Sequence, residues 1–183
     1  MDIASNAALI LIDVQAGFDD PRWGRRNNPE AEQNIALLLE HWRSTSRPVL
    51  HVRHDSQTAG SVLHPSKPGN GFKQEATPID GEAIYAKSVN SAFIGTRLEQ
   101  DLRRRGISSL VIVGLTTNHC VSTTARMAGN LGFETFVVSD ATATFDRMGI
   151  DGRLREAQDV HAGALSDLHG EFATVVGSSS LLA

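Results

Sequence analysis

The stretch AALILIDV, residues 7–14, sets the interpretation of the whole chain. Six consecutive apolar residues followed by the carboxylate of Asp13 are typical of a parallel strand that is buried on both faces. Similar apolar segments recur and alternate with stretches that have the spacing of amphipathic helices. We predict strands at 7–14, 48–52, 83–86, 109–115, 135–139 and 172–176. This alternation predicts a three-layer α/β fold, with helices on both faces of a six-stranded, mostly parallel sheet.

Four helices are predicted between these strands. The first begins at Asn28-Pro29, as an N-cap and a first-turn proline, and carries apolar residues from Ile35 to Trp42. The others are expected from the capping box Thr96-x-x-Glu99 to Gly106, over 116–131, and from Leu154 to Leu168 before Gly170. The segment 54–81 contains three prolines and four glycines without periodicity, which predicts a long functional loop. No repeat or linker interrupts the pattern, so we expect a single domain over residues 1–183.

Composition narrows the class of partner. The chain has 17 Lys and Arg against 21 Asp and Glu, a net charge of −4, which disfavours binding to nucleic acid or to a membrane surface. Its longest apolar run, residues 7–12, is far too short to span a membrane, and no signal peptide is recognised at its start. Cys120 is the single cysteine, so no internal disulfide or multi-cysteine metal site can form. We therefore expect a cytoplasmic protein that acts on a small molecule.

Three reactive side chains are predicted to meet at one edge of the sheet. Ligands of open α/β sheets bind beyond the carboxyl ends of the strands, where Asp13, Lys87 and Cys120 would stand. A neighbouring lysine and a helix N-terminus both favour a thiolate, so we expect a lowered pKa for Cys120. Asp13 could carry the thiol proton to a leaving group, and backbone amides near Cys120 could bind an oxyanion. Together these residues predict nucleophilic catalysis.

The chain resembles the isochorismatase-like cysteine hydrolases over nearly its whole length. The resemblance rests on LIDVQAGF (11–18), KSVNSAFIGTRLEQDLRRRGI (87–107), LVIVGLTTNHCVSTTARMAGNLGF (110–133) and VVSDATATF (137–145). It implies the family's Rossmann-like fold and a catalytic triad of Asp13, Lys87 and Cys120. It also implies a cis peptide at Leu115–Thr116, an oxyanion hole made by the amides of Thr116 and Cys120, and a homodimer or homotetramer.

Further side chains are candidates for substrate binding or for metal binding. We assign Phe18, His54, Ser91, Phe93 and His119 as candidate substrate contacts. The set His51, His54, Asp55 and His64 contains ordinary zinc ligands. However, the Asp-x-His spacing of the related nicotinamidases is absent, because His54 and Asp55 are adjacent and no histidine lies two residues after Asp55. We therefore expect neither a metal nor an organic cofactor.

The departures from the family pattern favour one reaction. True isochorismatases cleave a vinyl ether and lack the nucleophilic cysteine. Cys120 therefore points instead to a C–N bond, in an amide, cyclic amide or carbamoyl compound, that is cleaved through a thioester. The loop and the KSVNSAFIGT segment look most like streptothricin-hydrolase-type or unassigned members. A nicotinamidase-like or isochorismatase-like activity on another small substrate is an alternative. Outside hydrolysis, the alternatives are a phospho-acceptor signalling module, a nucleotide-binding module and a non-catalytic binding protein. A phospho-acceptor module would need a second acidic residue beside Asp13, where Val14 stands. A nucleotide-binding module would need a GxGxxG or GKS/T motif, and the sequence contains neither.

Overall fold

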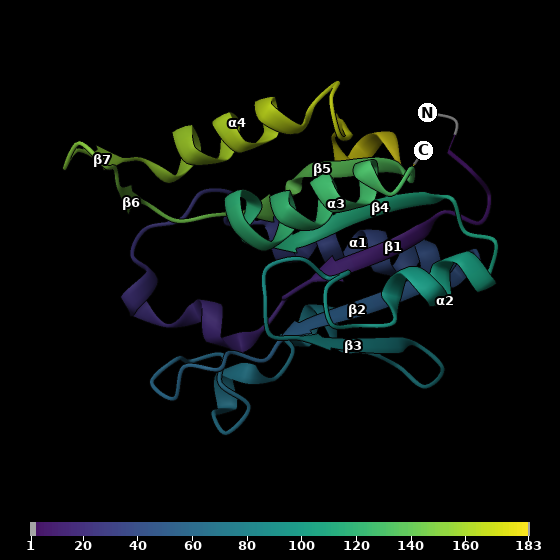
Figure 1. Ribbon diagram of the computed structural model, residues 1–183, viewed down its shortest axis with the longest axis horizontal. Coiled ribbons are helices and arrows are strands. Elements are labelled where there is room, and N and C mark those ends of the chain that lie inside the picture. Colours follow the sequence, from purple (N-terminus) through teal and green to yellow (C-terminus); the bar gives the residue numbers. More distant parts are fainter. Residues whose placement is uncertain (1–2, 183) are drawn as a thin grey trace.

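The computed structural model describes residues 3–182 and contains the predicted parallel sheet. Its six strands are all parallel and lie in the order β3-β2-β1-β4-β5-β8 (Figure 1). Their bounds are β1 Ala8–Ile12, β2 Val49–His54, β3 Ala83–Lys87, β4 Ser109–Leu115, β5 Glu134–Ala143 and β8 Thr174–Val176. The predicted three-layer α/β class is confirmed.

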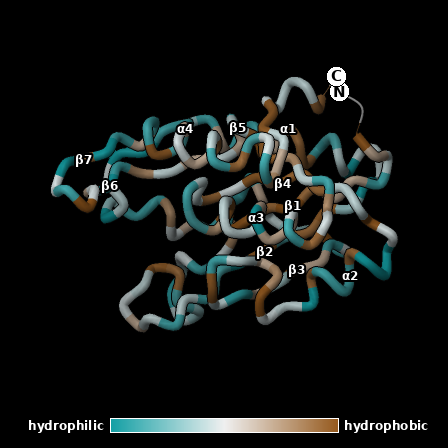
Figure 2. The backbone as a smooth tube through the Cα atoms, turned by 45° about the horizontal axis from the view of Figure 1, so that its top comes forward, coloured by the Kyte–Doolittle hydropathy of each residue, from teal (hydrophilic) through white to brown (hydrophobic). Residues whose placement is uncertain are grey.

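Alternation along the strands divides the core into two layers. Ile10 and Ile12 face the layer that holds helices α2 (Leu98–Arg104), α3 (Ser122–Asn130) and α4 (Ala157–Leu168). Leu9 and Leu11 face α1 (Ala31–Ser44) on the other side. In Figure 2 hydrophobic segments run along the central strands β1 and β4. Among the described residues, no helix has both the length and the apolar character needed to cross a bilayer.

The predicted starts of the first two helices are wrong. Asn28 is not an N-cap, because its backbone is left-handed (φ 42°) and its side-chain amide donates to the carbonyls of Ser139 and Thr142, at 2.8 and 2.7 Å. Asparagine tolerates this conformation, and the two tertiary bonds hold it there while α1 begins later. α2 begins at Leu98, whose N–H donates to the Thr96 hydroxyl; Glu99 pairs with Arg103 and does not complete the capping box.

The region predicted as the start of the last helix forms a hairpin instead. β6 (Arg147–Met148) pairs antiparallel with β7 (Leu154–Arg155), and α4 begins only after it. Leu154, predicted on the apolar face of the helix, is 59% exposed at this hairpin, which projects from the body of the molecule at the left of Figure 1. The helix predicted over 116–131 also differs, because it opens with a π-helical turn, Thr117–Val121, before α3.

The strand order positions the site. From β1 the chain builds the sheet outward through β2 and β3, then returns to place β4 on the other side of β1. A crevice for ligands forms at such a switch point, beyond the carboxyl ends of β1 and β4. Gly114 near the end of β4 has a φ of +119°, and a Cβ on it would lie 2.0 Å from the Ile12 carbonyl oxygen. The two central strands can therefore reach this edge side by side because residue 114 is a glycine.

Candidate active site

Three strand ends deliver the predicted reactive residues to the same place. Asp13 follows β1 directly, and its N–H donates to the Val52 carbonyl at 2.9 Å. Lys87 is the last residue of β3, and Cys120 lies in the π-helical turn that follows β4. Asp13 is fully buried, while Lys87 and Cys120 are 2% and 8% exposed. The structure therefore brings together the three residues that the sequence placed at this edge.

The Lys87 ammonium lies at the centre of this group. Its Nζ is 2.6 Å from Asp13 Oδ2, 3.3 Å from Cys120 Sγ and 3.1 Å from His54 Nδ1. An ammonium has three N–H donors, so these three acceptors use all of them and fix its orientation. The second Asp13 oxygen, Oδ1, is buried and has no hydrogen-bond partner within the described chain. That oxygen is available as an acceptor for a proton.

The expected low pKa of Cys120 is wrong. Burial raises the pKa of the thiol to about 12, and the negative charge of Asp13 adds to this, while Lys87 acts in the opposite direction. Burial also raises the pKa of Asp13 above its ordinary value, against the effect of Lys87. A thiol next to a more basic carboxylate can lose its proton to that carboxylate during attack. Slow alkylation of the free protein would consequently not argue against a catalytic Cys120.

His54 belongs to this hydrogen-bonded group and also lines the cavity above it. Its backbone is held by Gln15, whose side chain accepts from the His54 N–H at 2.8 Å and donates to the His54 carbonyl at 3.2 Å. Burial and the Lys87 charge lower the pKa of His54, which favours the neutral ring. Because Lys87 can only donate, Nδ1 of that neutral ring accepts the bond. The imidazole thus helps to orient Lys87.

A cavity of about 300 Å³ opens over these groups. Asp13, His54 and Cys120 contribute its reactive end, and a second set of residues forms its walls: Phe18, Trp23, Leu63, Asn90, Thr116 and His119. Phe18 and Trp23 pack with their ring centroids 5.2 Å apart. The wall near them is apolar and aromatic, whereas Asn90, Thr116 and His119 offer polar atoms.

The predicted substrate contacts divide into two groups. Phe18, His54 and His119 line the cavity, but Ser91 and Phe93 do not. Phe93 stacks on Phe133 with a centroid separation of 5.9 Å, and buried Ser91 accepts from the Phe93 N–H. These two are therefore core contacts, and the neighbouring Asn90 reaches the cavity in their place. Trp23, Leu63 and Asn90 were not recognised in the sequence, where they lie in segments without regular periodicity.

Hydrogen bonds define the tautomer of His119. Arg147 and the Asn118 amide both donate to its Nε2, each at 3.3 Å. Nδ1 therefore carries the hydrogen of the neutral ring and donates to the Thr116 hydroxyl at 3.1 Å. Burial lowers the pKa of His119, and the nearby Arg147 charge acts in the same direction. Next to this contact the Leu115–Thr116 peptide is cis, as the resemblance implies.

The side chains considered as metal ligands do not converge. His51 contacts Glu82 at 2.8 Å, Asp55 binds Arg53, and His64 contacts Ser66. Within residues 3–182, the group with ligand atoms close enough for one ion consists instead of Asp13, His54 and Cys120. Lys87 Nζ touches all three, so its ammonium stands where a cation would be bound.

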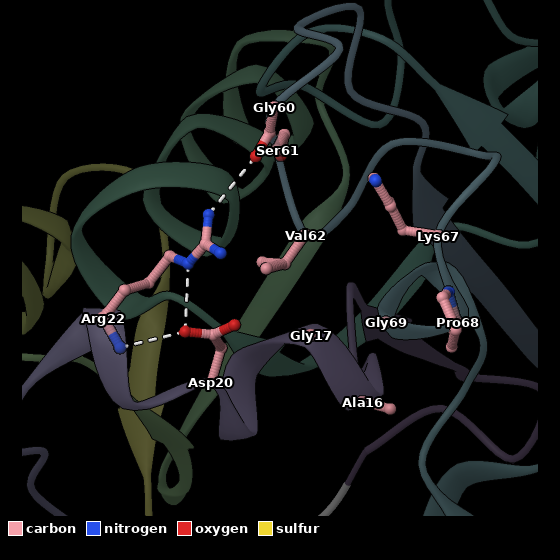
Figure 3. Close-up of a pocket in the computed structure, with 10 residues that line it drawn as sticks. All are labelled: Ala16, Gly17, Asp20, Arg22, Gly60, Ser61, Val62, Lys67, Pro68 and Gly69. Atoms are coloured by element: carbon pink, nitrogen blue, oxygen red, sulfur yellow. Dashed lines mark hydrogen bonds and ion pairs between the residues drawn. The ribbon is translucent and has the colours of Figure 1, made fainter.

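Figure 3 shows the residues that line a second cavity, of about 390 Å³. It is lined by Gly17 and Val62, whose sequence neighbours Phe18 and Leu63 line the first cavity. The wall is thin because Gly17 and Gly69 meet through their backbones; a Cβ on Gly69 would lie 2.8 Å from Gly17 Cα. In Figure 3 Arg22 bridges Asp20 and the Gly60 carbonyl across one end of this outer cavity.

Fold and site together define a three-layer α/β protein with a buried thiol at the switch point of its sheet. Residues 7–180 match the Isochorismatase domain, and the chain belongs to the isochorismatase family of hydrolases. It is 47% identical over 175 residues to the isochorismatase family protein YrdC of Bacillus subtilis, which covers 96% of this chain and 94% of that protein. It is also similar to an isochorismatase-family protein from Chromobacterium violaceum, with a TM-score of 0.96, 46% identity, and coverage of 99% of this chain and 94% of that one. The resemblance inferred from the sequence is confirmed.

Two more distant relatives are named for their activities. A streptothricin hydrolase of Streptomyces noursei is 30% identical over 142 residues, which cover 76% of this chain and 55% of that protein. Nicotinamidase 3 of Arabidopsis thaliana is 29% identical over 191 residues and covers 96% of this chain and 86% of that protein.

Proposed function

We propose that this hydrolase cleaves a C–N bond of a small amide, cyclic amide or carbamoyl compound, through a thioester on Cys120. The observation that carries the proposal is the contact of Lys87 with both Asp13 and Cys120 beneath a cavity of about 300 Å³. A cavity of this size accepts a small molecule, and its three reactive groups match the needs of acyl transfer.

The first half of the reaction would form the thioester. As Cys120 Sγ attacks the carbonyl carbon, its proton passes to Asp13, whose Oδ1 has no other partner within the described chain. Lys87 stabilises the negative charge on sulfur while the thiol, with its pKa of about 12, loses its proton. The amides of Thr116 and Cys120 would bind the oxyanion, a type of contact in which one donor contributes about 2.7–4 kcal/mol. The C–N bond then breaks as Asp13 returns the proton to the leaving amine.

The second half would release the product. Asp13 takes a proton from a water molecule, which attacks the thioester carbon, and the C–S bond then breaks to give the carboxylic or carbamic acid and the free thiol. Every proton is carried by Asp13, and the charge is compensated by Lys87. We accordingly propose a reaction without metal or organic cofactor. The homodimer or homotetramer implied by the resemblance stays a prediction.

The test is a screen of small amides, lactams and carbamoyl compounds, with nicotinamide and isochorismate included. Release of ammonia or amine is compared between the wild type, Cys120→Ser and Asp13→Asn. We expect at least one amide to be hydrolysed by the wild type and by neither variant, with a mass increase on Cys120 after rapid quenching. An amide that Cys120→Ser hydrolyses at the wild-type rate would contradict the proposal, and turnover of isochorismate alone would point to the ether-cleaving branch.

A further inference from the structure

Arg147 connects the projecting β6–β7 hairpin to the substrate cavity. It is exposed at the start of β6, yet its guanidinium lies 3.3 Å from Nε2 of His119, a residue of the cavity wall. A guanidinium has five N–H donors, and this contact uses one of them. The remaining donors are available next to the cavity.

Among the residues that the structure describes, the charge of Arg147 has no carboxylate partner. Within residues 3–182 no carboxylate oxygen lies within 4.0 Å of it, whereas Arg153 and Arg155 of the same hairpin both pair with Asp151. The adjacent Asp146 is already engaged, because its two oxygens accept from Arg25 and from the Ala157 N–H. Arg147 is therefore a cation in contact with a residue of the cavity wall, and the acid next to it in the sequence is bonded elsewhere.

The hairpin also places two cations opposite each other. Arg147 and Arg155 are directly paired across β6 and β7, where like charges repel. Asp151 compensates Arg155 at 2.7 Å, but not Arg147. An anion bound at Arg147 would relieve this repulsion and could form the bidentate contact that guanidinium makes with carboxylate.

We propose that Arg147 selects substrates that carry an anionic group, such as a carboxylate, beyond the bond that is cleaved. This inference rests on the proposed function for its reaction, but the binding preference can be tested without a known substrate. The amide end of such a substrate lies at Cys120, its apolar part lies against Phe18 and Trp23, and its anionic group reaches the His119–Arg147 side of the cavity. His119 orients Arg147 and stays neutral, so the positive charge on this side of the cavity is that of Arg147.

Alkylation with two small reagents provides the test, because Cys120 is the single cysteine. Iodoacetate and iodoacetamide react by the same step, in which sulfur bonds to carbon and iodide leaves, but only iodoacetate is anionic. The ratio of the two rates cancels changes in thiol reactivity. We expect this ratio to fall about threefold to tenfold in Arg147→Gln, because one unit charge at the cavity raises the local concentration of an anion.

Two further variants make the comparison specific. Arg147→Lys keeps the charge and should retain most of the wild-type ratio. Arg153→Gln removes a cation from the same hairpin that already has its acid, and should leave the ratio unchanged. An unchanged ratio in Arg147→Gln, or an equal fall in Arg153→Gln, would overturn the proposal.

Hydrolysis separates this inference from the proposed function. Succinamate and butyramide have the same chain length and amide but differ in the terminal carboxylate. If the wild type hydrolyses either, Arg147→Gln should raise KM for succinamate more than for butyramide, with a smaller effect on kcat. If the wider screen finds no amide substrate, the proposed reaction fails while the alkylation ratio still decides whether Arg147 favours anions.

Discussion

Two ion pairs in this protein have similar geometry but very different surroundings. Lys87 and Asp13 lie 2.6 Å apart with fully buried side chains, beneath the inner cavity. Arg22 and Asp20 lie 2.9 Å apart on the outer cavity, with side chains that are 54% and 30% exposed. Water screens the outer pair, whereas burial makes the inner charges interact strongly with each other and with any neighbouring group.

This difference indicates what each pair contributes. A buried pair is a poor source of stability, because the cost of removing two charges from water offsets most of their attraction. Its value here lies in the groups that it touches, since Lys87 Nζ also contacts Cys120 and His54. The outer pair ties Asp20 and the Gly60 carbonyl to one arginine and touches no reactive group.

The largest effect is expected from Lys87→Ala. The variant leaves the Asp13 charge next to the thiol without compensation, so the pKa of Cys120 should rise further above about 12. Hydrolysis should fall by about 10²–10³-fold, the usual cost of removing one group that stabilises developing charge in the transition state. In the wild type the rate of alkylation should keep rising with pH beyond ~8.5, the pKa of an ordinary thiol. In the variant the pH profile of this rate should move to still higher pH.

A second buried lysine serves as the matched control. Lys73 Nζ binds Glu32 at 2.8 Å and also Asp19. Within the described residues it contacts neither Asp13, His54 nor Cys120. Lys73→Ala should lower the free energy of unfolding but leave the pH profile of alkylation unchanged. If Lys87→Ala and Lys73→Ala give the same profile, Lys87 does not act on Cys120.

The next prediction concerns what replaces the ammonium. Removal of the Lys87 side chain leaves Asp13, His54 and Cys120, whose ligand atoms lie within 4.8 Å of one another, around a vacated position. A carboxylate, an imidazole and a thiolate are suitable zinc ligands, so Lys87→Ala should retain about one zinc ion per chain after dialysis. Elemental analysis measures it, with Lys87→Ala/His54→Ala as the control. Equal zinc retention by the wild type would show that the ammonium does not hold this position.

A smaller loss of activity is expected from Gln15→Ala, at the place where the loop 54–81 meets the ends of the strands. The buried Gln15 side chain bonds to both the N–H and the carbonyl of His54, and it donates to the Asn70 carbonyl at 2.8 Å. Gln15→Ala leaves the His54 N–H and the Asn70 carbonyl without these partners, while the Asn70 side chain still donates to the His54 carbonyl at 3.1 Å. The variant should cost about 1–3 kcal/mol per buried group in unfolding free energy. Hydrolysis should fall several-fold because His54 loses its position. Gln57→Ala, which removes an exposed bond to the Asp55 carbonyl, should change neither; a matching loss in both variants would contradict a specific role for Gln15.

The residues at the strand ends could be predicted from the sequence, whereas several residues of the cavity wall could not. Asp13 and Lys87 follow from apolar runs, because a parallel strand has one carboxyl end and all such ends share an edge. Trp23, Leu63 and Asn90 could not be found in this way, since their approach depends on long-range contacts such as the Gly17–Gly69 backbone contact.

Electrostatics was harder to predict than position. The sequence placed Lys87 near Cys120, and this favoured a thiolate. The outcome depends on how deeply both groups are buried and on the competing charge of Asp13, which together raise the pKa of the thiol. Burial of a particular atom is a property of the whole packed structure. The types of the neighbouring residues alone could therefore not show whether the pKa of the thiol is raised or lowered. The hairpin at β6–β7 was missed for a related reason, because Leu154 fits a helical pattern but is exposed.

The smallest effect is expected at the outer cavity. Arg22→Gln removes the guanidinium bonds to Asp20 and to the Gly60 carbonyl, both on the surface, while the backbone bond from residue 22 to Asp20 is kept. Exposed pairs of this kind contribute little, so kcat/KM should stay within about twofold of the wild type. The wall between the two cavities should keep its position, because the Gly17–Gly69 contact is made by backbone atoms and does not need Arg22. Steady-state kinetics on the best amide from the screen would check this, and melting temperature would show whether the loop has loosened. A fall well beyond twofold without a change in melting temperature would mean that the outer cavity takes part in binding substrate, and that the Phe18–Leu63 wall does not separate the two regions.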